Sequence, residues 1–334
     1  MLLADLTTMR VGGPARTLVT ASTRDELVAA ALDAWSSGED WLVLGGGSNV
    51  VIADDGFDGT VIHVTSRGIE RDGTTLRVQA GEPWDALVEF AVAERLAGLE
   101  ALSGIPGCSG AAPIQNIGAY GQELGDTLVS IEFLDYLSGE VERVTAAELG
   151  LGYRTSALKQ GRQGVVLSLE LQLRDSGVSL VTYPQLAREL GVPVESEATL
   201  PDIRSTVLRL RESKGMLLDP TDPDTTSCGS FFTNPIVSEN FARALPAELP
   251  QWLVDDLYVK LSAAWLIEQA GVSKGFSLPG SRAAISSKHS LAITNRGGAT
   301  AEEVAELARY IRARVAGAFG VELQPEPIAV GVQL

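Results

Sequence analysis

An irregular stretch between residues 99 and 125 is the part of the sequence most suited to holding a ligand. It contains six glycines and two prolines, carries few charges, and shows neither strand alternation nor helical periodicity. Small residues let a backbone approach a ligand closely, and the side-chain amides of Gln115 and Asn116 can fix the ligand's orientation. A long irregular segment is uncommon inside a compact domain unless it has a function. We therefore expect this segment to contact a bound cofactor.

A second glycine-rich loop, Gly45-Gly46-Gly47-Ser48-Asn49, follows an apolar run at 41–44 that predicts a buried strand. Successive backbone N–H groups in such a loop form a concave site for a phosphate. The loop is not the dinucleotide fingerprint, because Val50 stands where its last glycine would be, and no Gly-Lys-Ser/Thr of a P-loop occurs. A lone glycine triplet is typical of a tight turn. Two separated segments of this kind favour an extended dinucleotide instead.

The composition excludes several classes of partner. The 334 residues carry 26 Lys and Arg against 43 Asp and Glu, a formal net charge of −17. Nucleic acids and anionic membranes need a cationic face, so we expect neither as a partner. Two cysteines, Cys108 and Cys228, are typical of reduced thiols in a cytoplasm. With only two histidines there is no metal-ligand spacing, and no metal is expected. We find no secretory signal and no apolar run of membrane-spanning length.

The elements that must position these loops mix helices and strands. Thr23 and Glu26 form a capping box that predicts a helix to about residue 35. Thr300 and Glu303 predict a final helix, with one apolar face made of Val304, Leu307, Ala308, Ile311 and Val315. Further helices are expected at 84–96, 202–214 and 260–270, and strands at 41–44, 50–52, 60–64, 76–81, 165–173 and 291–294. A β-hairpin is expected from 131–136 and 141–144, and a loop with a short helix at 184–190 within 174–200.

Six motifs resemble, in the same order, those of the UDP-N-acetylenolpyruvoylglucosamine reductases of peptidoglycan synthesis. They are MRVGGPA at 9–15, LGGGSNVV at 44–51, IPGCSGAAPIQNIGAYG at 105–121, YRTS at 153–156, GSFFTNP at 229–235 and QPE at 324–326. The resemblance implies an α+β chain: a two-subdomain FAD-binding fold of the PCMH or vanillyl-alcohol-oxidase type, followed by a C-terminal α+β substrate domain. The expected subdomains are 1–66 with 319–334, and 67–200, with the UDP-sugar domain at 201–318.

The resemblance also implies non-covalent FAD, with its diphosphate on the 45–49 loop and its flavin and ribityl chain wrapped by 105–121. Cys108 is then expected to be a packed thiol rather than a covalent flavin link. The expected FAD-binding residues are Gly45, Gly46, Gly47, Ser48, Asn49, Ile105, Pro106, Gly107, Ser109, Gly110, Ala111, Gln115, Asn116, Gly118, Ala119, Tyr120 and Gly121.

The family's reaction has two stages that share one pocket. NADPH reduces FAD and leaves, and UDP-N-acetylglucosamine-enolpyruvate then enters and is reduced to UDP-N-acetylmuramate. Hydride addition to the vinyl carbon creates enolate-like charge, which requires a cation and a proton donor. Arg154 suits the carboxylate, Ser230 is implied as the proton donor, and Glu326 as the group that orients Arg154 or assists protonation. Without the resemblance, these three would read as a surface arginine, a turn serine and an exposed acid.

Binding of the UDP-sugar by an acidic protein needs local basic and hydroxyl groups. Tyr183 matches a substrate-covering loop of one branch of the family, which implies a lid that moves on binding. Lys214 and Lys260 also fit ordinary solvation at helix ends. The expected substrate-binding residues are Tyr183, Lys214, Asn234, Lys260, Lys274 and His289.

Two departures from the family pattern affect the detail of flavin contacts. Thr7-Thr8 stands where members commonly have Asn-Thr, and Ile328 replaces a basic residue that many carry after the glutamate. Two competing hypotheses remain: an FAD oxidase of alcohols or sugars that uses oxygen, and a non-catalytic flavin- or nucleotide-binding protein. The joint presence of Arg154, Ser230 and Glu326 favours the NADPH- and FAD-dependent reductase, which we expect to be a cytoplasmic monomer.

Overall fold

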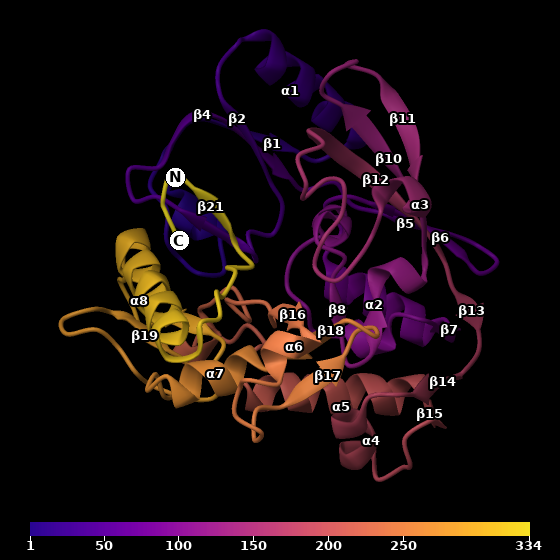
Figure 1. Cartoon of the computed structure of the whole chain (residues 1–334). Helices are drawn as coiled ribbons and strands as arrows, with labels where there is room; N and C mark the ends of the chain where they lie inside the picture. Colours follow the sequence, from indigo (N-terminus) through magenta and orange to yellow (C-terminus); the bar gives the residue numbers. More distant parts are fainter. The chain divides into compact units, whose positions relative to one another are not determined.

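The computed structural model describes residues 1–334 (Figure 1). Its internal contacts divide the chain into two compact units. Unit 1 comprises Met1–Pro14, Gly47–Phe57 and Lys214–Leu334, and unit 2 comprises Ala15–Gly46 and Asp58–Ser213. Both units mix helices with strands. None of the helices combines the length and apolar character needed to cross a membrane. The three-domain organisation expected from the sequence is not tested by this division and stays a prediction.

The main sheet of unit 2 has five antiparallel strands in the order β11-β10-β12-β6-β5. These strands are β5 (Ile69–Asp72), β6 (Thr75–Gln79), β10 (Leu128–Asp135), β11 (Val141–Thr145) and β12 (Gly164–Gln172). Helix α2 (Trp84–Ala93) shares one core with the sheet, in which Trp84, Leu87 and Leu169 are almost fully buried. The predicted hairpin is confirmed as β10 and β11, and α3 (Ala146–Leu149) follows it.

A three-stranded sheet in the order β1-β4-β2 carries the first glycine loop. It consists of β1 (Ala15–Ala21), β2 (Trp41–Leu44) and β4 (Phe57–Val64), with β2 parallel to β4. The predicted first helix is confirmed as α1 (Arg24–Ser36), because the Thr23 side chain accepts a hydrogen bond from the Glu26 N–H. Helix α1 packs Leu27 and Ala31 into a core with strand residues of both sheets. Strand β2 ends directly before Gly45.

The irregular segment at 99–125 contains only short elements. They are 3₁₀ turns at Glu100–Leu102, Ser109–Ile114 and Leu124–Asp126, and the two-residue strands β8 (Gly118–Ala119) and β9 (Gln122–Glu123). The absence of strand or helix patterning in the sequence is therefore confirmed at this position.

The stretch at 174–213 is more ordered than the sequence indicates. Helix α4 (Pro184–Leu190) confirms the predicted short helix, and α5 (Leu200–Ser213) confirms the helix predicted at 202–214. The stretch also forms β13 (Arg174–Asp175, paired with β7, Leu96–Ala97) and an antiparallel pair of β14 (Val178–Val181) and β15 (Ser196–Thr199). Val181, Leu186 and Ile203 bury one another there. The expectation of a loop was wrong because these strands are short and paired across an intervening helix.

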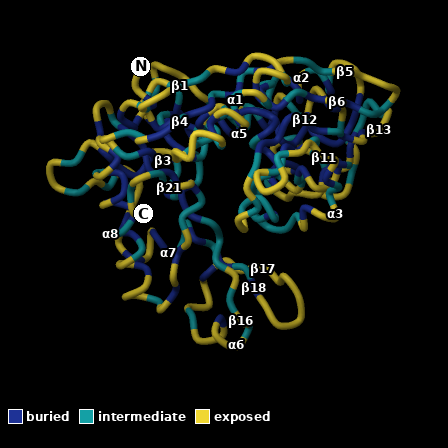
Figure 2. The backbone as a smooth tube through the Cα atoms, turned by 90° about the horizontal axis from the view of Figure 1, so that it is seen from above, coloured by how far each residue is buried: buried dark blue, intermediate teal, exposed yellow.

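In unit 1 the C-terminal segment pairs in parallel with an early strand: β21 (Ile328–Val330) lies beside β3 (Val50–Ile52). It also contains a sheet in the order β16-β18-β17 and the hairpin β19–β20. Their bounds are β16 (Ile236–Ser238), β17 (Gln251–Leu253), β18 (Tyr258–Leu261), β19 (Ala283–Ile285) and β20 (Ile293–Asn295), with helices α6 (Glu239–Ala242), α7 (Ala263–Gln269) and α8 (Ala301–Phe319) and 3₁₀ turns at Leu3–Leu6 and Pro223–Thr225. In Figure 2 the loop between β17 and β18 is exposed, in agreement with the high exposure of Leu253 and Leu257.

The predicted helix at 260–270 was wrong at its start. Lys260 lies in β18, where it is opposite Ile236 on one side and Trp252 on the other. Helix α7 begins only at Ala263, because the Ser262 side chain accepts a hydrogen bond from the Trp265 N–H and caps it. The final helix is confirmed as α8, capped by Thr300 and ended by Gly320 at φ 66°.

We predict that Leu307→Ala destabilises the protein by about 2–5 kcal/mol, because it opens a cavity in the core beneath α8. Leu307 is fully buried there. Glu306→Ala, an exposed position on the same helix, is the matched control and should change stability by less than about 0.5 kcal/mol. Urea unfolding followed by circular dichroism measures both. Equal effects of the two variants would contradict this assignment of the α8 core face.

Candidate active site

The two glycine-rich segments contact each other within unit 2. A Cβ built on Gly45 would lie 2.2 Å from Cys108 Sγ, and one on Gly46 would lie 2.7 Å from Gly107 Cα. With Cys108 and Gly107 in place, neither position has room for a side chain. The structure thus brings together two segments that the sequence predicts to hold one cofactor.

The second segment is fixed to the turn between β6 and α2. The Ser109 N–H donates to Glu82 O at 2.8 Å, and the Gly110 N–H donates to Ala80 O at 2.7 Å. A Cβ on Gly110 would lie 2.6 Å from Ala80 Cβ. The segment is therefore held against the sheet by its backbone, with no room for larger residues at this point.

Cys108 is a buried thiol in this arrangement. Burial raises its pKa, and the backbone N–H groups of Gly46, Ala111 and Gly110 oppose that rise only in part. A thiol of this kind has low reactivity. Its environment supports the expectation of a packed side chain, while non-covalent flavin binding stays a prediction.

Asn116 organises the segment rather than presenting its amide to a ligand. Its Nδ2 donates to Glu123 Oε2 at 2.8 Å and to Gly152 O at 3.1 Å, and its Oδ1 accepts from the Gly125 N–H at 2.8 Å. The side chain is buried, so a cofactor contact at this position has to come from the backbone.

Arg154 lies at the tip of a tight turn that approaches the same segment. Gly152 and Thr155 close the turn by reciprocal backbone hydrogen bonds. The Arg154 guanidinium donates to Asn116 O at 3.3 Å and to Gly118 O at 2.5 Å. Arg154 and Asn116 both have positive φ, 54° and 47°, although neither is glycine. Such strain is most often found at functional sites.

Tyr183 contacts the end of the predicted flavin segment. Its ring packs edge-on against Tyr120 with 5.7 Å between the ring centroids. A Cβ on Gly121 would lie 2.6 Å from Thr182 Oγ1, so the two segments are in close contact. Tyr183 is largely exposed and lies directly before α4. This position fits a lid residue, but movement of the lid stays a prediction.

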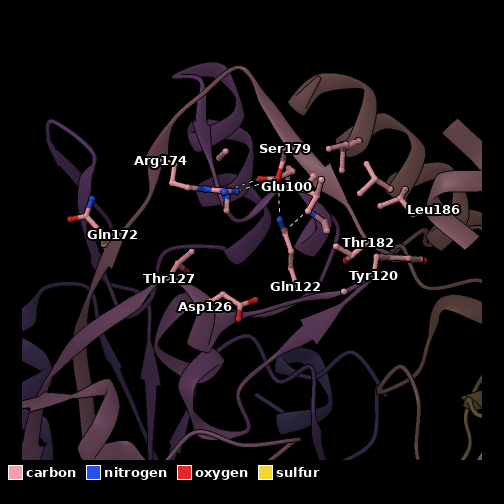
Figure 3. A pocket seen from close by; sticks show the side chains of 17 residues that line it. Glu100, Tyr120, Gln122, Asp126, Thr127, Gln172, Arg174, Ser179, Thr182 and Leu186 are labelled. Carbon is pink, nitrogen blue, oxygen red and sulfur yellow. Dashed lines mark hydrogen bonds between the residues drawn. The ribbon is translucent and has the colours of Figure 1, made fainter. Parts of the chain in front are cut away.

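A pocket of about 350 Å³ lies beside this contact, within unit 2 (Figure 3). Gln122 Nε2 donates to Glu100 Oε1 at 2.6 Å, and Arg174 Nη2 donates to Ser179 Oγ at 3.4 Å. Of the predicted site residues, only Tyr120 and Gly121 line it. No signal in the sequence indicated this pocket, because its polar residues come from several separate turns and strands and form no motif.

Ser230 lies in unit 1 on a segment held from both sides. The next residue, Phe231, is fully buried, its N–H donates to Leu291 O at 2.7 Å, and its carbonyl accepts from the Glu326 N–H at 2.9 Å. Ser230 and Glu326 therefore lie on two segments that are joined by a backbone hydrogen bond. The Ser230 Oγ is 3.3 Å from His289 Nε2.

The later part of the first glycine loop contacts the same segments of unit 1. Asn49 Nδ2 donates to Glu326 O at 3.2 Å, and the Ile328 N–H donates to Asn49 O at 3.0 Å. The Thr8 N–H donates to Gly47 O at 3.0 Å, while its Oγ1 donates to Ser227 O at 2.7 Å. Thr8 thus anchors the loop.

Asp224 was missed by the sequence analysis but fixes the loop that carries His289. Its carboxylate accepts from the Ser287 N–H at 2.8 Å and from Ser287 Oγ at 2.5 Å, and lies 2.9 Å from Arg296 Nη2. Although burial opposes the charged form, these hydrogen bonds and Arg296 leave the pKa of Asp224 below its usual value. No local motif in the sequence indicated this network.

The other predicted substrate-binding residues are dispersed over unit 1. Asn234 Oδ1 accepts a hydrogen bond from the Ala263 N–H at 3.0 Å and so supports the start of α7. Lys214 follows α5, and Lys274 is exposed on a loop. Their contacts with a substrate stay predictions.

Arg154 belongs to unit 2, whereas Ser230 and Glu326 belong to unit 1. Their predicted meeting over one flavin face therefore stays a prediction.

Cys228, which lies near Ser230 in the sequence, is buried. This burial raises the pKa of its thiol to about 12, so the thiol is inert at neutral pH.

We predict that Gly45→Ala destabilises the protein by about 1–3 kcal/mol and lowers its flavin content, because the new methyl group collides with Cys108 Sγ. The double variant Gly45→Ala/Cys108→Ala should recover both, since the two Cβ atoms would be an ordinary 3.7 Å apart. Gly317→Ala, in open space on α8, is the control. Thermal unfolding and the flavin-to-protein absorbance ratio report the result; no recovery in the double variant would show that the contact is misassigned.

Two family descriptions match separate parts of the chain. "FAD binding domain" matches residues 15–145, and "UDP-N-acetylenolpyruvoylglucosamine reductase, C-terminal domain" matches residues 219–330. Ser230 and Glu326 lie in the second match, and both glycine-rich segments lie in the first.

Relatives match over almost the full length. The UDP-N-acetylenolpyruvoylglucosamine reductase of Leifsonia xyli is 56% identical over 99% of this chain and 98% of its own. That of Saccharopolyspora erythraea is 47% identical over 99% and 95%. The crystal structure of the same reductase from Thermus caldophilus has a TM-score of 0.68 at 30% identity, over 99% of this chain and 97% of its own. These matches confirm the predicted α+β fold class with its FAD-binding part, and the chain belongs to the family of UDP-N-acetylenolpyruvoylglucosamine reductases.

Proposed function

We propose that this oxidoreductase uses NADPH and non-covalently bound FAD to reduce UDP-N-acetylglucosamine-enolpyruvate to UDP-N-acetylmuramate, a step of peptidoglycan precursor synthesis in the cytoplasm. The match of the reductase C-terminal domain to residues 219–330 carries the proposal. An oxidase that shared only the FAD-binding domain with this family would not need the reductase C-terminal domain. Full-length identity of 56% to a reductase supports the same conclusion.

We place the flavin dinucleotide on unit 2, where the two glycine-rich segments meet. Gly45 and Gly46 pack against Cys108 and Gly107, and Gly46 is exposed, so the loop backbone there is open to close approach of a diphosphate. When bound, the flavin would accept a hydride from NADPH and pass it on to the enolpyruvyl double bond. We assign the dinucleotide to the FAD-binding residues given above and both substrates, in turn, to one pocket of a monomeric enzyme.

Three side chains then perform the reduction of the second substrate. Arg154 is permanently charged and grips the enolpyruvyl carboxylate, where negative charge develops. Ser230 donates the proton that the neighbouring carbon needs, because a carbanion is a far stronger base than an alkoxide. Glu326 orients the arginine or assists the protonation. The backbone hydrogen bond between Glu326 and Phe231 supports a joint role for Ser230 and Glu326.

We predict that NADPH, added without oxygen, bleaches the flavin absorbance of the purified protein and that UDP-N-acetylglucosamine-enolpyruvate restores it. Both half-reactions are required by the proposed sequence of substrates. UDP-N-acetylglucosamine, which lacks the enolpyruvyl group, is the control and should not restore the colour. Recovery of colour only on admission of oxygen would support an oxidase and contradict the proposal.

We predict that Ser230→Ala leaves the NADPH half-reaction unchanged and slows the recolouring half-reaction by about 10²–10⁴-fold, the usual size of a proton-transfer contribution. Ser36→Ala, at an exposed position of α1, is the control. Stopped-flow absorbance separates the two halves. An equal loss in both halves would remove Ser230 from the role of proton donor.

A further inference from the structure

An aliphatic alcohol is a weak acid at neutral pH, so a serine that gives up its proton needs help from a neighbour. Ser230 has one in unit 1, because its Oγ lies 3.3 Å from His289 Nε2. Both side chains are partly exposed, so solvent can reach the pair. The sequence analysis placed His289 among the substrate-binding residues, and the geometry gives it a different task.

We propose that His289 is the positioning residue for Ser230: it turns the hydroxyl hydrogen toward the reacting carbon and returns a proton to the oxygen afterwards. This inference rests on the proposed function, since it needs Ser230 to be the proton donor. It assigns to one imidazole both the orientation and the recovery of that donor.

The donor and the acceptor in the hydrogen bond between Ser230 and His289 follow from the proposed role of Ser230 as proton donor. Its own hydrogen must point at the substrate carbon, so its oxygen has to accept a hydrogen bond from His289 Nε2–H. As the carbon–hydrogen bond forms and the Ser230 O–H bond breaks, the imidazolium Nε2–H bond breaks and a new O–H bond forms on Ser230. The imidazole is left neutral, Ser230 is again an alcohol, and water supplies the next proton to the ring.

The backbone around His289 is held well enough for this task. The His289 N–H donates to Ser286 Oγ at 3.2 Å, and the His289 carbonyl accepts from the Ala292 N–H at 3.1 Å. Two residues earlier, Ser287 is bonded to Asp224 through both its N–H and its hydroxyl.

The neighbouring residue adds a further tie, since Lys288 Nζ lies 2.6 Å from Asp222 Oδ2. Both acids come from the 3₁₀ turn Pro223–Thr225 and the residue before it. The loop is thus fixed by acidic side chains that are remote from the loop in the sequence and precede Ser230 on its own segment. Preorganisation of this kind keeps a proton donor within reach of its partner.

Half-reaction kinetics test the proposal with two substitutions of His289. His289→Ala should keep the NADPH half-reaction and slow the recolouring half-reaction by about 10²-fold, and added imidazole should restore much of the loss. His289→Gln, which can still donate a hydrogen bond but cannot carry a proton, should stay slow and should not respond to imidazole. His63→Gln, on β4 in unit 2, is the matched control and should match the unsubstituted protein.

Nuclear magnetic resonance gives a readout that does not depend on turnover. The chain contains only two histidines, so histidine-labelled protein shows two imidazoles and His63→Gln assigns them. Ser230→Ala should move the Nε2 resonance of His289 and leave that of His63 in place. An unmoved His289 resonance would show that the hydrogen bond is absent and would overturn the proposal.

The outcomes separate this inference from the proposed function. If Ser230→Ala recolours at the normal rate, Ser230 is not the donor and both ideas fail. If Ser230→Ala is slow but His289→Ala is fast, or if imidazole gives no recovery, the proton-returning role alone is wrong. If His289→Gln were fully active, His289 would only orient the Ser230 hydroxyl. This result would also overturn the proposed return of a proton by His289.

Discussion

The close approach of two backbones at Gly45 and Cys108 is the constraint on which the flavin-binding part depends. A Cβ at residue 45 would collide with the Cys108 sulfur, so no side chain larger than hydrogen fits there. Strand β2 delivers the first segment to this point, and the turn after β6 holds the second. Cys108 fills the remaining space with a small, unreactive thiol. The glycines thus serve the protein's own packing as well as any phosphate they receive.

Unit 1 holds Ser230, the proton donor that we propose, on a firmly anchored segment. Phe231 and Phe232 are buried side by side, with 5.3 Å between their ring centroids, and anchor the residue before them. Backbone hydrogen bonds then tie this segment to residues 291 and 326. Functional side chains on a segment anchored this way lose little orientation, which is what proton transfer requires.

Local signals in the sequence were sufficient for much of this structure. The capping residues Thr23 and Thr300 and the apolar face of α8 mark their helices, because capping and periodicity act within a few residues. Ordered motifs identified the family and thus the fold class. The pair β14–β15 was missed and the start of α7 misplaced, because pairing with distant strands decides where short strands form.

In the candidate site, too, local sequence motifs revealed some residues, while contacts between residues far apart in the sequence stayed hidden. Glycine-rich loops, Arg154, Ser230 and Glu326 could be proposed from motifs. The role of Asn116 in holding its own segment, the support of the 286–289 loop by Asp224, and the contact of His289 with Ser230 all depend on partners far away in the chain. No spacing rule predicts such contacts from a single sequence.

Our proposal requires Arg154, Ser230 and Glu326 to act on one and the same carboxylated carbon of the substrate. A crystal structure of the flavin-loaded protein with UDP-N-acetylmuramate bound measures this directly. We expect the Arg154 guanidinium on the lactyl carboxylate and Ser230 Oγ next to the carbon that bears this carboxylate. A lactyl group bound away from Arg154, or facing away from Ser230, would contradict it.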